Sequence, residues 1–520
     1  MSELDLVKEN AEFEQLIRED KIDIPIKDEY LIPDTHPDVY KILSVTAVPE
    51  ITKKEITKDK INIEGKVRYT VVYLAEEDGI LVNSVNYLES FSNSINLKQD
   101  EHKTICEAFF IKSDINGSIM NERKISIDSL FTLQFEIYKS KNFEFVKDIN
   151  SDYDVETLKK TETVNKIKCS GEVTMPGKTI MRIGMDKEQA EKIIHCSLSL
   201  HKREVKLAQD KAYIGCYCYV KVVYRTSDSK NIMVAEDDIY LSKDKECEGI
   251  TEDMMACSDF EVRDIDMNLE EDDLGEKRII NCEFNVISTV KVFSEETIAA
   301  VDDAYSPDAV ISVKREMCEF GILQGINSEQ ITVRDNIKLG EDTLKPEEII
   351  SEKASVSISD KKVLSDKVIV EGIINAEVFY KTDDEENPVS SIKAEIPFSS
   401  AVSIPGATDE MHAILKTYIE DVDASIEGNS IGIKIEPNIV AKVYYETNKE
   451  FIVDVYEDEN KIPSKKASMT IYVVGKDDTL WGLAKKFNTT VDSILKVNDI
   501  ADENKIYIGQ KIIIPGRVKL

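Results

Sequence analysis

The sequence has few of the features that membrane and exported proteins need. Among its 520 residues, no apolar run approaches the roughly 18 residues that a membrane-spanning helix requires. No transmembrane segment is therefore predicted. The first residues, MSELDLVKENAEFEQLIRED, carry acids where a secretory signal has a basic segment followed by an apolar one. We therefore expect a cytosolic protein.

Several motifs of catalytic and metal-binding proteins are also absent. The chain has no G-x-x-x-x-G-K-[ST] phosphate loop, no G-x-G-x-x-G and no H-E-x-x-H. Its acidic runs, such as residues 270–273, lack the spacing of a calcium loop. No catalytic residue, metal site or cofactor is predicted, and we expect the chain not to be an enzyme. A carboxylate pair for glycoside hydrolysis stays open, because 100 acidic residues offer many pairs.

Histidine and tryptophan are scarce, with five and one copies in the whole chain. His195 and His201 flank a segment, CSLSL, that alternates as a strand does, so we expect both at a surface or a sheet edge. The nine cysteines form no C-x-x-C pair, and their number is odd. This pattern predicts buried thiols in a reducing compartment, not a disulfide framework.

Basic residues are fewer than acidic ones. The 100 acidic residues outnumber the 66 basic ones, which leaves a net charge of −34. Such a chain repels nucleic acid and anionic lipid, so neither is expected as a partner, and it favours a basic protein partner or simply solubility. Residues 469–520 differ, with eight basic and six acidic residues, so their net charge is +2 and that of residues 1–468 is −36.

The most informative feature of the sequence is an internal repeat. Three segments align without a gap, each with an Asp-Lys pair followed at one interval by a tyrosine: Tyr73, Tyr224 and Tyr380. The copies recur after 151 and 156 residues. Upstream of each lies a stretch expected to form a short helix, such as EQAEKIIH. The chain therefore contains three copies of one domain.

Within the repeats, apolar residues fall on alternate positions, as in Ile61, Ile63, Val67, Tyr69 and Val71. This period predicts a long strand with one buried face, the usual state in an antiparallel sheet. Gly65 and Gly372 interrupt the strand at one position, which suggests a bulge or a bend. Each copy is predicted to be a β-sandwich or open barrel with one or two short helices.

The predicted organisation is a multi-domain, mainly β chain ending in a small βααβ domain. Its parts are an acidic amphipathic helix over 1–20, β-rich repeats over 21–150, 151–310 and 311–456, a linker over 457–468 and the small domain over 469–516.

The C-terminal segment shows the strongest motif. We expect a strand over 470–474, a helix over 479–487 with Asp478 as N-cap, a helix over 491–498 capped by Thr490, and a closing strand over 511–514. Along this whole length the sequence TIYVVGKDDTLWGLAKKFNTTVDSILKVNDI…NKIYIGQKIIIP resembles the LysM family.

LysM modules bind N-acetylglucosamine polymers in a shallow groove between two loops. By resemblance, the groove positions here are Asp477, Asp478, Thr479, Ile506, Tyr507, Ile508 and Gly509, next to Lys476 and Leu480. Asp477 replaces a glycine common in the family, and Ile508 replaces a proline. Because a side chain where glycine is usual obstructs close approach, these departures favour a groove reused for a protein partner over glycan binding.

The single tryptophan, Trp481, lies off the apolar stripe of its helix, which Leu480, Leu483, Ala484 and Phe487 form. It either folds back over the edge of the module or contacts a partner, since tryptophan is enriched at the energetic centres of interfaces. The predicted partner-binding residues are Trp481, Leu480, Lys476, Lys485 and Lys486.

The full arrangement of repeats, linker and LysM module resembles the SipL family of clostridial spore-coat morphogenesis proteins. The resemblance implies a mother-cell protein at the forespore surface, in the spore coat. Its LysM module would bind SpoIVA, the ATPase that polymerises into the basement layer of the coat. The body would offer a surface to other coat proteins. The alternative is a peptidoglycan-binding protein or an accessory hydrolase of the cortex.

Overall fold

The computed structural model describes most of the chain, and strands dominate it. The described residues are 4–57, 59–76, 79–97, 104–340, 343–458, 468–500, 502 and 505–516. The linker predicted over 457–468 lies outside the described residues except for its ends. No helix in the described ranges is long and apolar enough to cross a membrane.

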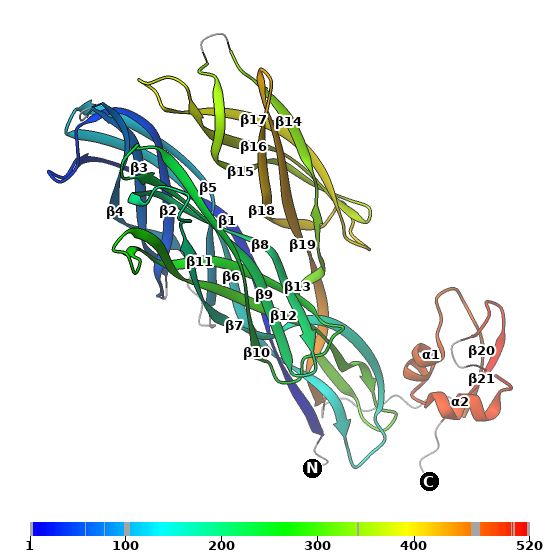
Figure 1. Cartoon of the computed structure of the whole chain (residues 1–520). Coiled ribbons are helices and arrows are strands. Elements are labelled where there is room, and N and C mark those ends of the chain that lie inside the picture. Colours follow the sequence, from blue (N-terminus) through cyan, green and yellow to red (C-terminus); the bar gives the residue numbers. More distant parts are fainter. Residues whose placement is uncertain are drawn as a thin grey trace.

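Each repeat folds as a sandwich of two antiparallel sheets (Figure 1). In the first repeat, the sheet orders are β1-β6-β5 and β2-β3-β4. The strands are β1 (Asp5–Leu31), β2 (Val39–Ile56), β3 (Lys60–Glu76), β4 (Ile80–Asn96), β5 (Thr104–Asn121) and β6 (Lys124–Asn150). The buried faces of both sheets share one core, as period-2 strands require.

The second and third repeats copy this plan, with sheet orders β11-β12-β7 and β10-β9-β8, then β13-β19-β14 with β18 on β19, and β15-β16-β17. The second has β7 (Glu156–Arg182), β8 (Ala190–Ala208), β9 (Lys211–Thr226), β10 (Ile232–Glu246), β11 (Met255–Glu271) and β12 (Lys277–Tyr305). The third has β13 (Ile311–Gln330), β14 (Val333–Lys338), β15 (Pro346–Leu364), β16 (Lys367–Thr382), β17 (Val389–Ser403), β18 (His412–Glu427) and β19 (Ser430–Glu457).

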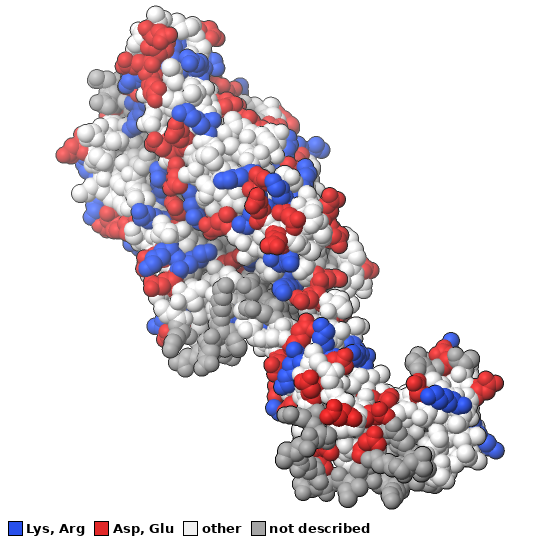
Figure 2. Space-filling model, turned by 90° about the horizontal axis from the view of Figure 1, so that it is seen from below, with Lys and Arg blue, Asp and Glu red and all other residues white. Residues whose placement is uncertain are grey.

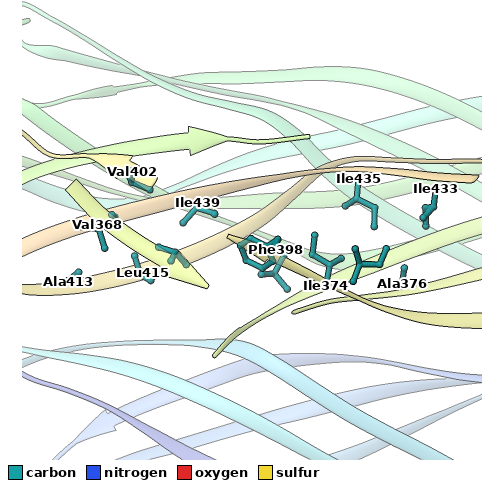
Figure 3. Packing of buried hydrophobic residues seen from close by; sticks show 14 of the residues in the cluster. Val368, Ile374, Ala376, Phe398, Val402, Ala413, Leu415, Ile433, Ile435 and Ile439 are labelled. Atoms are coloured by element: carbon teal, nitrogen blue, oxygen red, sulfur yellow. The ribbon is translucent and has the colours of Figure 1, made fainter. Parts of the chain in front are cut away.

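Aliphatic and aromatic side chains from facing sheets fill each sandwich. Figure 3 shows this core in the third repeat, where Ile374 and Phe398 come from one sheet and Leu415 and Ile435 from the other. The predicted equivalence of Tyr73, Tyr224 and Tyr380 is confirmed, because each lies buried on the middle strand of its sheet, β3, β9 or β16.

The predicted bulge at the repeat glycines is confirmed too. The register shifts between Ile51 and Lys53 opposite Gly65, and between Ile358 and Asp360 opposite Gly372. A β-carbon on Gly65 would lie 2.3 Å from the carbonyl oxygen of Glu50 and from the ring of Phe91. Only glycine therefore fits this close approach of two strands and a ring.

The three sandwiches pack around a common axis with approximate threefold symmetry. Equivalent residues of all three meet in shared apolar clusters. One cluster joins Val146, Val301 and Ile452. Another joins Val82, Ile232 and Val389. These positions are equivalent because they hold the same place in the strand registers. Beyond their own cores, the repeats are thus held together by apolar contacts that each copy contributes alike.

Two helix predictions for the body are wrong. Residues 5–20 belong to β1, which pairs with β6 from Asp5 opposite Asn150 to Leu31 opposite Lys124. The stretch EQAEKIIH, residues 188–195, belongs to β8 from Ala190 onward. Both sequences suit an amphipathic helix locally, but pairing with a long neighbouring strand overrides that preference.

The cysteine prediction also needs correction. Cys169 and Cys247 form a disulfide, whereas the other seven cysteines are free. The two partners are 78 residues apart in sequence, and the folding of the second repeat brings their Cα atoms to 5.8 Å. This is within the range that a disulfide spans.

The C-terminal module has the predicted βααβ order. It consists of β20 (Met469–Val473), α1 (Leu480–Phe487), α2 (Val491–Val497) and β21 (Lys511–Pro515), with β20 and β21 antiparallel. The mainly β fold class with a small βααβ domain is thus confirmed.

Candidate functional site on the C-terminal module

The helix termini of the module are set by local hydrogen bonds. Thr479, not Asp478, is the N-cap of α1, because its side chain accepts a hydrogen bond from the backbone N–H of Gly482. Asp478 instead accepts from the N–H of Gly475 at 2.7 Å and closes the preceding loop. Thr490 caps α2, as predicted, through the N–H of Ser493.

The predicted groove positions come together at one end of the module. The backbone N–H of Gly509 donates to the carbonyl of Val474 at 2.8 Å, and the N–H of Val474 donates to Gln510 at 2.9 Å, so the two loops are joined. Asp477 has a φ of 64°, the left-handed conformation that glycine adopts most easily. Tyr507 and Ile508 are 70% and 74% exposed. The loop that ends at Gly509 therefore presents the side chains of Tyr507 and Ile508 to solvent.

Trp481 contacts the body of the same chain. Its indole Nε1 donates to Asp303 Oδ2 at 3.0 Å. Its ring packs edge-on against Tyr305, with centroids 4.9 Å apart. Lys485, one helical turn further along α1, pairs with the same carboxylate at 2.7 Å. The tryptophan is thus partly buried between the apolar cluster of the module and the body.

Tyr305 anchors this contact. It is only 5% exposed, belongs to the apolar cluster of the module and donates its hydroxyl to the carbonyl of Thr489 at 2.9 Å. Burial alone would raise the pKa of Asp303, but the ammonium of Lys485 and the indole N–H of Trp481 outweigh it and lower this pKa. Figure 1 shows the module beside one end of the body, with α1 on the side of the module that faces the body.

The remaining predicted residues lie apart from this contact. Leu480 is buried in the module core at 2% exposure, so it supports α1 from within. Lys476 is exposed beside the groove. Lys486 is also exposed, and its ammonium stands 5.0 Å from the ring centre of Tyr472. Of the five predicted partner-binding residues, the structure therefore brings Trp481 and Lys485 together.

Asp303 and Tyr305 were not identified from the sequence. They precede Trp481 by about 180 residues in the chain, and neither belongs to a known motif. The one available signal is their recurrence, because Asp454 and Tyr456 end the third repeat with the same spacing.

A second concentration of polar groups lies where the three repeats meet. Glu136, fully buried, accepts two hydrogen bonds from Lys442 at 2.7 and 2.9 Å. Lys416 pairs with Asp259 at 2.5 Å, and Lys291 with Glu107 at 2.7 Å. The last two pairs line a cavity of about 720 Å³ between the repeats. Each acid here has a basic partner, so the cluster serves to join the repeats.

One G-x-S-x-G sequence occurs at residues 428–432, but it forms the hairpin between β18 and β19, where Ser430 donates its hydroxyl to the carbonyl of Glu427 at 3.0 Å. A hydrolase elbow would instead join a strand to a helix. Within the described ranges, no group of three or more His, Cys, Asp or Glu side chains is placed to hold a metal.

Comparison with known families agrees with this architecture. The family model "SipL, SPOCS domain" matches residues 38–120, 189–270 and 345–427, and the LysM model matches residues 472–515. The chain has the SipL architecture. No solved structure matches it.

The matched families set the broad function. SipL points to sporulation and the spore coat, and LysM is a peptidoglycan-binding type of module. Both are binding domains, and no enzymatic family is indicated. Each SPOCS match spans the four strands from β2 to β5 or their equivalents. It stops before the long strands β6, β12 and β19, which carry Glu136, Lys291 and Lys442 and the contact with the module.

Proposed function

We propose that the chain is a non-enzymatic adaptor of spore-coat morphogenesis, acting in the mother cell at the forespore surface. Its LysM module would bind a SpoIVA-like basement-layer ATPase through the α1 face, and its body would present a surface to further coat proteins. The observation that supports this proposal is the contact of Trp481 and Lys485 with Asp303, in which the α1 face binds an acidic surface of the chain's own body.

The charges of the chain support a protein partner rather than a polyanion. On the face drawn in Figure 2, acidic and basic residues are mixed over the body without a continuous basic surface. The body is strongly acidic and the module is slightly basic, so the module can approach acidic protein surfaces that the body repels.

The α1 face cannot hold Asp303 and a partner at once, so the two contacts must compete. Trp481→Glu is expected to abolish capture of the ATPase by the full chain, since the ring is lost and a carboxylate replaces it. Asp303→Ala weakens the contact between the α1 face and the body without altering the face itself, so capture is expected to be retained or strengthened. Co-purification of each variant with the ATPase measures this. Normal capture by Trp481→Glu would disprove the role of this face.

Glycan binding is the second candidate, and the exposed ring of Tyr507 favours it, because this loop stays accessible to solvent while α1 contacts the body. Sedimentation with purified peptidoglycan tests it, with Tyr507→Ala as the variant. Binding that Tyr507→Ala removes and Trp481→Glu preserves would assign the groove to glycan. The assay also reveals an accessory hydrolase through release of soluble fragments.

A further inference from the structure

The position that receives the LysM module exists in all three repeats. Asp148, Asp303 and Asp454 each follow a one-residue bulge in the long strand of their repeat. Each carboxylate also accepts a hydrogen bond at 3.0 Å from the N–H of the next residue. The three positions are therefore equivalent in register and in local geometry.

Two residues further on, the repeats differ. The second repeat has Tyr305, which the module covers, and the third has Tyr456. The first has Asn150 and offers no ring, and Lys159 holds its Asp148 at 2.7 Å. Only the second and third repeats thus combine the carboxylate with an aromatic ring.

The Asp-Tyr pair of the third repeat is open. Tyr456 is 55% exposed, against 5% for Tyr305. Lys314 lies opposite Asp454 in the register but pairs with Glu316 at 2.8 Å, and no other described residue makes an ion pair with Asp454. A carboxylate and an exposed ring are thus presented together, in the arrangement that elsewhere in the chain binds an indole N–H and an ammonium group.

We propose that Asp454 and Tyr456 form a second docking site, or seat, for a LysM module, and that the module of another copy of this chain binds there. The chain has one module, and that module already occupies the first seat at Asp303 and Tyr305. A module from another copy carries the matching groups, Trp481 and Lys485. It is slightly basic, whereas the body that receives it is acidic.

This contact joins unlike surfaces, the module of one chain and the third repeat of the next. Such a heterologous interface does not close on itself unless the rotation between copies completes a ring, so it extends into open chains. At the first seat, the chain's own module is favoured over the module of another copy, because the tether gives it an effective concentration on the order of millimolar. Chains therefore join when a module leaves its own first seat.

The first experiment supplies a chain whose module is free. Tyr305→Asn together with Tyr456→Asn removes the ring from both seats, and asparagine is the residue that the first repeat has at this position. Mixed with the wild-type chain, this donor is expected to form a 1:1 complex of about twice 58.9 kDa by light scattering. Mixed with a Tyr456→Asn acceptor, it should stay monomeric. An equal complex with that acceptor, or none with wild type, overturns the proposal.

A charge exchange tests the seat without touching the tyrosines. Lys485→Glu repels the module from Asp303 of its own chain, and Asp454→Lys gives a second chain a complementary seat. The mixture is expected to form a heterodimer, while each variant alone stays monomeric. A mixture that stays monomeric while both proteins melt as wild type does would overturn the proposal.

Discussion

At the scale of single residues, the centre of the molecule shows how the three repeats avoid burying like charges next to one another. The bulges in the long strands make Glu136, Lys291 and Lys442 equivalent positions. Copies with the same residue would place like charges near one another in the interior, which is costly. Burial alone would raise the pKa of Glu136, but Lys442, Lys416 and Lys291 outweigh it and hold the carboxylate ionised.

Removing one partner of this central pair should therefore be costly. Lys442→Met leaves Glu136 buried beside two lysines that have other partners, and we expect a loss of roughly 3 kcal/mol in stability. Glu136→Gln added to Lys442→Met should recover much of it, because the unpaired charge is gone. Thermal unfolding of both variants measures this. A double variant no more stable than Lys442→Met would show that the pair matters through packing alone.

The contact of Trp481 with the body has its own optical signal, because the chain has no other tryptophan. Asp303→Ala removes the acceptor of its indole N–H and the partner of Lys485. At a concentration low enough to keep the chains monomeric, we expect a red shift of the emission and stronger quenching by acrylamide. Asp148→Ala, the equivalent change in the first repeat, is the control and should leave the emission unchanged. The contact would be in doubt if both variants behaved alike.

At the scale of elements, the bulged strands depend on glycine where a ring and a neighbouring strand come close. Gly65→Ala would place a β-carbon 2.3 Å from Glu50 and Phe91, so we expect destabilisation of about 1–3 kcal/mol. Gly321→Ala in β13 is the control, since its β-carbon would stand at an ordinary 3.6 Å from the nearest atom. Urea unfolding compares the two. Equal stability of both variants would show that the strands can separate at Gly65 without cost.

At the scale of the whole molecule, His195 lies on β8, an edge strand of its sheet as the sequence predicts, but it faces the neighbouring repeats where the three meet. His195 lines a cavity of about 110 Å³ with Ser44 and Ser351, its equivalents in the other repeats. Burial, and to a lesser extent Lys353, lowers its pKa to about 4. The folded molecule therefore keeps this ring neutral at neutral pH.

This lowered pKa predicts a pH-dependent stability. The unfolded chain takes up the proton near pH 6.5 and the folded one only near pH 4, so this stability is present above pH 6.5 and is lost as the pH falls toward 4. The loss is at most about 3 kcal/mol. His195→Ser, which copies the other two repeats, should flatten the profile of unfolding midpoint against pH in this window. An unchanged profile would mean that other groups control it.

Much of the architecture follows from the sequence itself. The period-2 strands, the register that makes Tyr73, Tyr224 and Tyr380 equivalent and the order of the LysM module are local or repeated patterns, which a single chain displays directly. Only the tertiary structure decided that residues 5–20 form a strand, because β6 supplies their partners from more than a hundred residues away. It also decided what Trp481 contacts. The helical pattern shows only that Trp481 lies off the apolar stripe of α1. Asp303 and Tyr305 contact the ring because the module packs against the end of β12, and no local sequence pattern encodes that packing.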